Sequence, residues 1–249
     1  MTNNNMIFIA NWKMNGEKSH ISDIKKTVNF SKKRKNKKNQ IIYCPPFTLI
    51  SLIKNMVKNT NIKVGAQNLY QLNDYGPFTG SVNSKLIKSA GGDYVIIGHS
   101  EIRNYENDLI INKKIQSALK ENLKVIFCIG ETLKEKKNNR TFKVLKKQIT
   151  TALKEIKKIN NIIFAYEPRW AIGTGKIPKL DELSKNFRNI NKIINKLKKN
   201  QKFKIIYGGS VNSKNVSELK KISDLKGYLI GSASLRAKNF IDIIKKSTN

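Results

Sequence analysis

Short apolar runs rich in β-branched residues alternate with longer amphipathic segments along the whole chain, which greatly narrows the possible folds. Eight strands are predicted, at Met6–Ala10, Gln40–Cys44, Ile62–Gly65, Tyr94–Ile97, Lys124–Ile129, Asn161–Ala165, Phe203–Tyr207 and Gly227–Ile230. Most of these runs are continuously apolar and do not alternate with a period of two. That pattern is typical of parallel strands that are covered on their outer face by helices.

The amphipathic segments between the strands predict helices. They cover Ser22–Lys33, Thr48–Met56, Ser84–Ser89, Asp108–Asn122, Arg140–Ile159, Leu180–Asn200, Asn215–Lys221 and Asn239–Lys246. Eight strand-then-helix units in 249 residues match a (β/α)₈ barrel. Because no linker and no abrupt change of composition interrupts them, we expect a single domain over residues 1–249. A doubly wound open sheet is the structural alternative.

The chain carries 49 Lys and Arg residues against 17 Asp and Glu, which gives a net charge of +32 with neutral histidines. Such a charge is typical of nucleic-acid-binding proteins. The lysines are scattered over nearly every amphipathic segment, however, and the densest run, Lys32–Lys38, lies where a solvated turn is expected. We therefore interpret the charge as a bias in residue usage. A positive surface would also steer phosphorylated substrates toward the protein, and it predicts weak incidental binding to nucleic acid.

Sequence features also bear on location and metal content. No apolar run approaches the roughly 20 residues of a membrane-spanning helix, and Met1–Asn5 lack the start of a secretory signal. The cysteines, Cys44 and Cys128, do not form a metal-ligand cluster with His20 or His99. We expect a cytoplasmic protein with reduced thiols, without a metal and without a cofactor.

Residues capable of chemistry follow the carboxyl ends of the predicted strands. They are Asn11, Lys13, His99, Glu101, Glu131 and Glu167. Strands seven and eight run into the small residues of Gly208–Ser210 and Gly231–Ser232, whose backbone N–H groups suit an anion. Active sites of (β/α)₈ barrels lie at this end, with a phosphate site after the last two strands. The pattern indicates acid–base chemistry on a small phosphorylated molecule.

Proton abstraction next to a carbonyl is the simplest reaction for these groups, because no redox-cofactor motif or nucleophile elbow is present. Glu167 would be the base, and His99 would donate to the developing enolate oxygen. Lys13 would supply positive charge, and Asn11 would orient the others. The alternative interpretation makes each charged residue a surface charge or ion-pair partner, and each glycine a turn residue.

Four longer segments contain most of these positions. They are Phe8–Gly16, Ile96–Glu101, Ala165–Lys176 and Tyr207–Val211. Together they resemble the triosephosphate isomerase family, and the likeness covers essentially the whole chain. The resemblance implies a single (β/α)₈ TIM barrel and interconversion of D-glyceraldehyde 3-phosphate and dihydroxyacetone phosphate through an enediolate. It also implies a role in glycolysis and gluconeogenesis, no cofactor or metal, and a homodimer.

The resemblance also implies residue roles. Glu167 would shuttle the proton between carbons, and neutral His99, held by a helix N-terminus, would polarise the carbonyl. Lys13 would bind substrate and pair with Glu101, while Asn11 would contact the substrate. Residues 168–176 would form a lid that closes over the phosphate. The remaining roles fall to Gly173, Ser210, Gly231 and Ser232 in phosphate binding, and to Thr79, which would reach the partner subunit.

The chain departs from the family pattern at several positions. Ser232 replaces a usual glycine, so phosphate binding requires that serine tolerate the local backbone. Arg169 and Pro178 alter the two ends of the lid. Ser81 and Ile102 together remove an ion pair that usually crosses the dimer interface. Other functions left open are a different phosphate-binding barrel enzyme, a catalytically decayed barrel, and a nucleic-acid-binding or scaffold protein.

Overall fold

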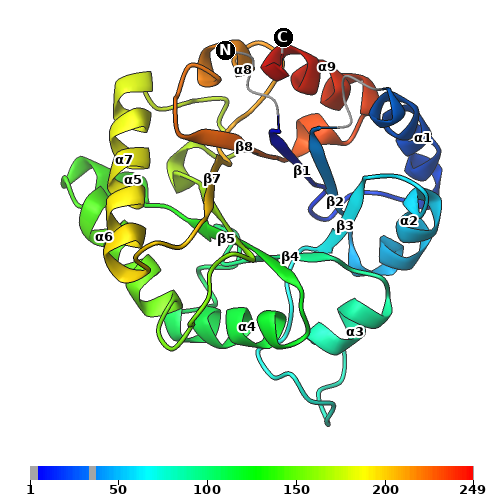
Figure 1. Cartoon of the computed structure of the whole chain (residues 1–249), viewed down its shortest axis with the longest axis horizontal. Coiled ribbons are helices and arrows are strands. Elements are labelled where there is room, and N and C mark those ends of the chain that lie inside the picture. The colour runs from blue at the N-terminus through cyan, green and yellow to red at the C-terminus, as the bar shows by residue number, and fades with distance from the viewer. Residues whose placement is uncertain (1–4, 34–37, 249) are drawn as a thin grey trace.

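The computed structural model describes residues 5–33 and 38–248, and a closed parallel barrel forms its centre. The strands pair in chain order, with β8 returning to β1 (Figure 1). They are β1 (Ile7–Asn11), β2 (Gln40–Cys44), β3 (Lys63–Ala66), β4 (Tyr94–Ile97), β5 (Lys124–Ile129), β6 (Ile162–Tyr166), β7 (Lys204–Tyr207) and β8 (Leu225–Ile230). The predicted (β/α)₈ barrel is confirmed, and closure excludes the open sheet.

The helices form a ring outside the barrel (Figure 1). They are α1 (Lys18–Lys32), α2 (Ile50–Val57), α3 (Ser84–Ser89), α4 (Asp108–Lys120), α5 (Leu133–Lys137), α6 (Thr141–Ala152), α7 (Leu180–Leu197), α8 (Val216–Leu219) and α9 (Ala237–Thr248). In α7, Leu183, Phe187 and Ile190 are buried on one face, as their spacing predicts.

Two helical features differ from the prediction. The segment expected to be helical over Arg140–Ile159 ends at Ala152, because the chain turns and Glu155 adopts a φ of +63°. The apolar pattern continues through buried Ile156 and Ile159, although these residues are not helical. Periodicity alone therefore predicted a helix that is too long. The short helix α5 was not predicted; Thr132 begins it with a reciprocal capping box.

The apolar core has two parts, separated by the barrel wall. Side chains such as Ile9, Ile96, Ile126 and Ile206 fill the barrel interior. A larger cluster lies between the strands and the helices. Side chains alternate between these faces along each strand. This rigid scaffold holds the loops at the carboxyl ends of the strands in place.

The structure also bears on the expectations for the cysteines, the chain start, the lysine-rich run and membrane-spanning helices. Cys44 and Cys128 are buried free thiols, and burial raises the pKa of both. Residues 1–4 and 34–37, which include much of Met1–Asn5 and of the lysine-rich run, lie outside the described residues. Within residues 5–33 and 38–248 no helix combines the length and apolarity needed to cross a membrane.

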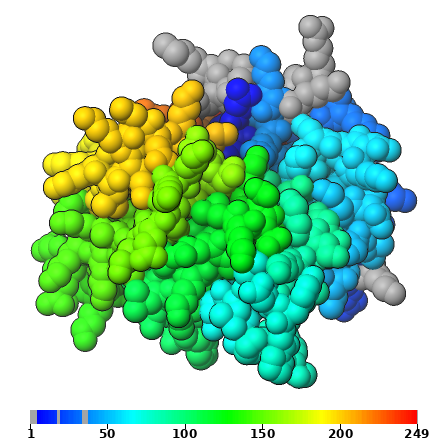
Figure 2. Space-filling view, turned by 60° about the horizontal axis from the view of Figure 1, so that its bottom comes forward, coloured from blue at the N-terminus to red at the C-terminus, as the bar shows by residue number. Residues whose placement is uncertain are grey.

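The segment between β3 and α3 stands out from the barrel body. It appears as the extended loop at the lower edge of Figure 1 and as the cyan projection at the lower right of Figure 2. Three of its large apolar side chains are exposed, namely Leu72, Tyr75 and Phe78. Exposed apolar side chains gathered on one projecting loop are typical of a protein-binding surface.

Candidate active site

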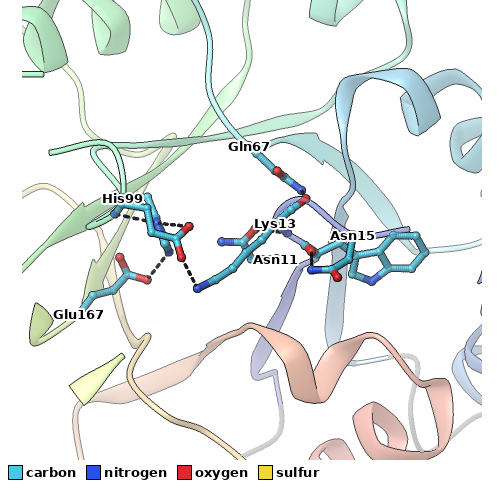
Figure 3. Close-up of polar contacts among 8 residues, drawn as sticks. Asn11, Lys13, Asn15, Gln67, His99 and Glu167 are labelled. Atoms are coloured by element: carbon cyan, nitrogen blue, oxygen red, sulfur yellow. Dashed lines mark hydrogen bonds and ion pairs between the residues drawn. The ribbon is translucent and has the colours of Figure 1, made fainter. Parts of the chain in front are cut away.

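The end of β1 positions Lys13 in an unusual backbone conformation. Lys13 has a φ of +53°, a region that residues other than glycine rarely adopt. Its N–H donates to Asn11 Oδ1 at 3.0 Å, and its carbonyl accepts from Gln67 Nε2 at 2.8 Å. These two bonds hold the strained turn, so that the side chain of Lys13 extends toward His99 and Glu167 (Figure 3).

The Lys13 ammonium group forms an ion pair with Glu101, which lies in the loop after β4. Lys13 Nζ lies 2.6 Å from Glu101 Oε1. The Lys13 side chain is 29% exposed and that of Glu101 is 54% exposed, so the pair lies at the edge of the site. The ion pair joins the loops that follow β1 and β4.

His99 lies at the end of β4, and its hydrogen bonds define its tautomer. The Glu101 N–H donates to His99 Nδ1 at 3.3 Å, which assigns the ring proton of the neutral imidazole to Nε2. That nitrogen lies 3.5 Å from Glu167 Oε1. The helix N-terminus expected at His99 is instead a short hydrogen-bonded turn, since α4 begins only at Asp108.

Glu167 follows β6 and is almost completely buried, at 2% exposure. Burial raises its pKa above the ordinary value, while His99, Lys13 and Arg103 act in the opposite direction. Within the described part of the chain, Glu167 Oε2 has no hydrogen-bond partner. A desolvated carboxylate with a free oxygen is well suited to accept a proton from a substrate carbon.

The lid segment, residues 168–176, is bound to the barrel near both of its ends. Trp170 Nε1 donates to Glu131 Oε1 at 2.9 Å. Ser210 Oγ, after β7, donates to the Ala171 carbonyl at 2.6 Å and accepts from the Gly175 N–H at 3.2 Å. Ser210 therefore connects the lid to the loop that follows β7.

Three loops contribute Gly173, Ser210 and Ser232 to the cavity that the catalytic candidates line. The backbone N–H groups of these residues have no hydrogen-bond partner among residues 5–33 and 38–248. Ser232 opens a short 3₁₀ turn, Ser232–Ser234, and its φ is not positive, so serine replaces the usual glycine without backbone strain. The arrangement can receive the oxygens of one phosphate group.

Most of the predicted site residues converge on this space, which we call the catalytic cavity. It has a volume of about 430 Å³, and its lining includes Asn11, Lys13, His99, Glu167, Gly173, Ser210, Gly231 and Ser232. Glu101 lies beside it through Lys13. Thr79 does not line it; this residue is exposed on the loop after β3.

Two contacts that shape this site were not predicted from the sequence. Gln67 Nε2 donates to the carbonyls of both Lys13 and Cys44, which joins the ends of β1 and β2. At Gly208 an added Cβ would lie 2.6 Å from Glu167 Cγ, so only glycine leaves room for this carboxylate. Their positions after β3 and β7 were the available signals. In the described ranges, no group of three or more His, Cys, Asp or Glu residues is placed to hold a metal ion.

Comparison with known proteins places this geometry in a family. The family model described as triosephosphate isomerase matches residues 6–247. The chain belongs to the triosephosphate isomerase family. It is 40% identical over 246 residues to triosephosphate isomerase of Alkaliphilus oremlandii, covering 96% of this chain and 98% of that protein. The protein of the same name from Endomicrobium trichonymphae is 40% identical over 252 residues, covering 97% of this chain and 98% of the relative.

A solved structure gives the same result. The crystal structure of triosephosphate isomerase from Bartonella henselae has a TM-score of 0.89 and 32% identity, covering 98% of this chain and 99% of the other. The predicted family, fold and isomerase class are thereby confirmed.

Proposed function

We propose that the protein interconverts D-glyceraldehyde 3-phosphate and dihydroxyacetone phosphate in the cytoplasm, as a step of glycolysis and gluconeogenesis. The observation that carries this proposal is one shared cavity. In it the buried Glu167 carboxylate lies 3.5 Å from His99 Nε2, and the lining includes residues whose backbone N–H groups have no partner within the described ranges. Family membership supplies the substrate class.

The reaction moves a proton between adjacent carbons. Glu167 removes the proton from the carbon beside the carbonyl, and the C–H electron pair becomes the C=C bond of an enediolate. The former carbonyl oxygen gains negative charge, and His99 Nε2–H and the Lys13 ammonium group stabilise it. His99 gives its Nε2 proton to that oxygen and takes up the proton of the neighbouring hydroxyl group, whose oxygen becomes the new carbonyl oxygen. Glu167 returns the carbon-bound proton to the former carbonyl carbon, where the C=C electron pair forms the new C–H bond, so no electrons are gained or lost overall.

Phosphate binding and water exclusion complete the mechanism. The N–H groups of Gly173, Ser210 and Ser232 bind the phosphate oxygens, and Asn11 contacts the rest of the substrate. The lid keeps water away, because an exposed enediolate would eliminate phosphate. The hydrogen bonds that join the lid to Glu131 and Ser210 support this role.

The direct test is a coupled assay of glyceraldehyde 3-phosphate isomerisation by the purified protein. We expect turnover without added metal or cofactor. A folded protein without turnover would contradict the proposal and favour the decayed barrel. Salt-resistant, sequence-specific RNA or DNA binding together with inactivity would instead favour the nucleic-acid-binding alternative.

The raised pKa of Glu167 predicts the acidic limb of the pH profile. The base must be ionised, so kcat/KM should fall as pH decreases through a pKa above the ordinary 4.5, because burial disfavours the charged carboxylate. The measurement is kcat/KM against pH at constant ionic strength, with structure followed by circular dichroism. Full activity down to pH 4.5 would contradict the assignment of this base.

We also propose that the protein is a homodimer, with Thr79 reaching the partner subunit. The loop after β3 exposes Leu72, Tyr75 and Phe78, while Met14, beside Lys13, is 97% exposed. A side chain of this type in full contact with water is better accommodated in an interface. Ser81 and Ile102 carry no charge, so this interface has no buried charge left unpaired at these positions.

Sedimentation equilibrium should therefore show a dimer. Phe78→Asp should shift the protein toward monomer and lower activity at least tenfold, since it places an unpaired charge in the interface. Phe142→Asp is the matched control, because Phe142 on α6 has a similar exposure, 43% against 37% for Phe78. A wild-type monomer with full activity would contradict the dimer proposal.

A further inference from the structure

A second cavity lies at the opposite end of the barrel, where the strands begin. We call it the basal cavity; it has a volume of about 570 Å³. It is lined by the first residues of several strands and by the loops that lead into β6 and β7. Pockets of a few hundred Å³ accommodate ligands of nucleotide size. The proposed isomerase reaction makes no use of this cavity.

Lysines dominate the charge of the basal cavity. Its charged lining residues are Lys124, Lys202, Lys204 and Lys226, and no Asp or Glu among the described residues lines it. Lys124 lies two residues before Ile126 on β5, and Lys204 lies two residues before Ile206 on β7, so each lysine is on the inward face of its strand. Ile126 and Ile206 fill the barrel interior. These two ammonium groups therefore belong to the barrel mouth.

None of the ammonium groups of these four lysines forms an ion pair or a hydrogen bond with another described residue. Lys124 Nζ lies 5.7 Å from the centre of the Tyr94 ring. By contrast, Lys54 and Lys114 elsewhere in the fold have carboxylate partners. Like charges around one cavity repel each other, and a bound anion would remove that repulsion.

A buried hydroxyl group supplies a second, independent observation. Tyr94 lines the basal cavity and is only 2% exposed. Its hydroxyl oxygen accepts a hydrogen bond from Gln40 Nε2. No described residue accepts the proton of this hydroxyl group. Burial raises the pKa of Tyr94 to about 12, so the hydroxyl keeps this proton and can donate it to an anion.

The walls of the basal cavity are ordered by specific contacts. Gln201 Oε1 accepts from the Ile159 N–H at 2.8 Å, and its Nε2 donates to the Lys157 carbonyl at 2.8 Å. These bonds join the loops before β6 and β7. Ile7, Ile163 and Phe203 add apolar surface to the lining. The cavity therefore combines a cationic rim, the hydroxyl group of Tyr94 and apolar walls.

We propose that the basal cavity binds a small molecule that carries two or more linked phosphate groups. A chain of phosphates can contact several lysines at once, whereas a single phosphate would leave some of them unpaired. The Tyr94 hydroxyl supplies a directional hydrogen bond. The site lies at the other end of the barrel from the catalytic cavity, and it does not depend on the proposed isomerase activity.

The test uses tripolyphosphate as the probe and isoleucine methyl NMR as a site-resolved readout. Ile7 and Ile163 report on the basal cavity, and Ile172 reports on the catalytic cavity. We expect saturable shifts of the Ile7 and Ile163 methyl groups at constant ionic strength. Shifts confined to Ile172 would overturn the proposal, because the anion would then occupy the catalytic cavity only.

Variants separate a specific site from diffuse charge. Lys124→Gln/Lys204→Gln should weaken tripolyphosphate binding at least tenfold by calorimetry. The control variant Lys25→Gln/Lys32→Gln removes the same charge from exposed positions on α1, and it should change the affinity for tripolyphosphate less than twofold. Equal weakening in both would overturn the proposal. If the first variant does not fold, Tyr94→Phe keeps the ring and should still weaken binding several-fold.

A final comparison identifies the source of the phosphates. ATP that binds more tightly than tripolyphosphate would show that the apolar walls hold a nucleoside, whereas equal affinities would indicate an inorganic chain. Either result requires adenosine alone to bind far more weakly than ATP. Adenosine binding as tightly as ATP would overturn the proposal, because the phosphates would then contribute nothing.

Discussion

Glu167→Gln should lower kcat/KM by about 10³- to 10⁴-fold while leaving the fold intact. The amide has nearly the shape of the carboxylate but cannot take a proton from carbon. KM should change little, because the backbone N–H groups at Gly173, Ser210 and Ser232 remain. The loss should therefore fall on kcat, which a coupled assay measures at saturating substrate.

A matched control is Glu218→Gln, which removes the same charge from an exposed residue whose carboxylate pairs with Lys221. It should retain wild-type kinetics. Thermal unfolding supplies a second check. Burial raises the folded-state pKa of Glu167, so ionisation of this group disfavours the fold as pH rises through that pKa. Glutamine stays neutral, and the variant should be at least as stable as wild type at pH 7. Activity within tenfold of wild type would contradict the role of Glu167.

The strand pattern predicted the barrel well because parallel strands buried on both faces are apolar throughout. The ranges of β2, β4 and β5 were predicted without error. Helix ends were less predictable, as Arg140–Ile159 shows. There the apolar spacing continues through buried Ile156 and Ile159, while Glu155 turns the backbone. Hydrophobic periodicity reports burial, and it does not distinguish a helix from a packed loop.

The sequence also predicted which side chains meet, because all parallel strands of a barrel end on one face. It could not predict how they are held. The left-handed backbone of Lys13 depends on Gln67, a contact between the loops after β1 and β3. The tautomer of His99 depends on one N–H from Glu101. Such contacts are tertiary, and no local pattern encodes them.

The lysines that give the chain its high net charge differ in their surroundings and in their ion-pair partners. Most lysines are solvated, yet Lys114 is buried with Glu106, and desolvation lowers its pKa. Lys13 is partly buried beside Glu101. The lysines of the basal cavity differ from both, since they line one cavity and have no acidic partner in the part of the chain that the structure describes. Total charge therefore says little about function, whereas the pairing of each lysine is informative.

Lys13→Met should lower kcat/KM by about 10²- to 10³-fold, through both a higher KM and a lower kcat. The ammonium group is the cation that lines the catalytic cavity among the described residues. It attracts the phosphorylated substrate, and it also stabilises the oxygen that becomes anionic in the transition state. Methionine is unbranched and ends one atom short of the lysine nitrogen, and it meets the same positive-φ backbone, so the change removes the charge with little change in shape.

The control must remove the same charge, because a less positive protein steers anionic substrates more slowly. Lys25→Met on α1 serves, since Lys25 is exposed and remote from the catalytic cavity. Its kcat/KM should stay within twofold of wild type at moderate ionic strength. In Lys13→Met the Glu101 carboxylate loses its partner, but at 54% exposure it remains solvated, so the melting temperature should change little. If both variants lost activity equally, the ammonium group of Lys13 would act only through long-range attraction. A selective loss in Lys13→Met would show that this charge acts at the reacting oxygen.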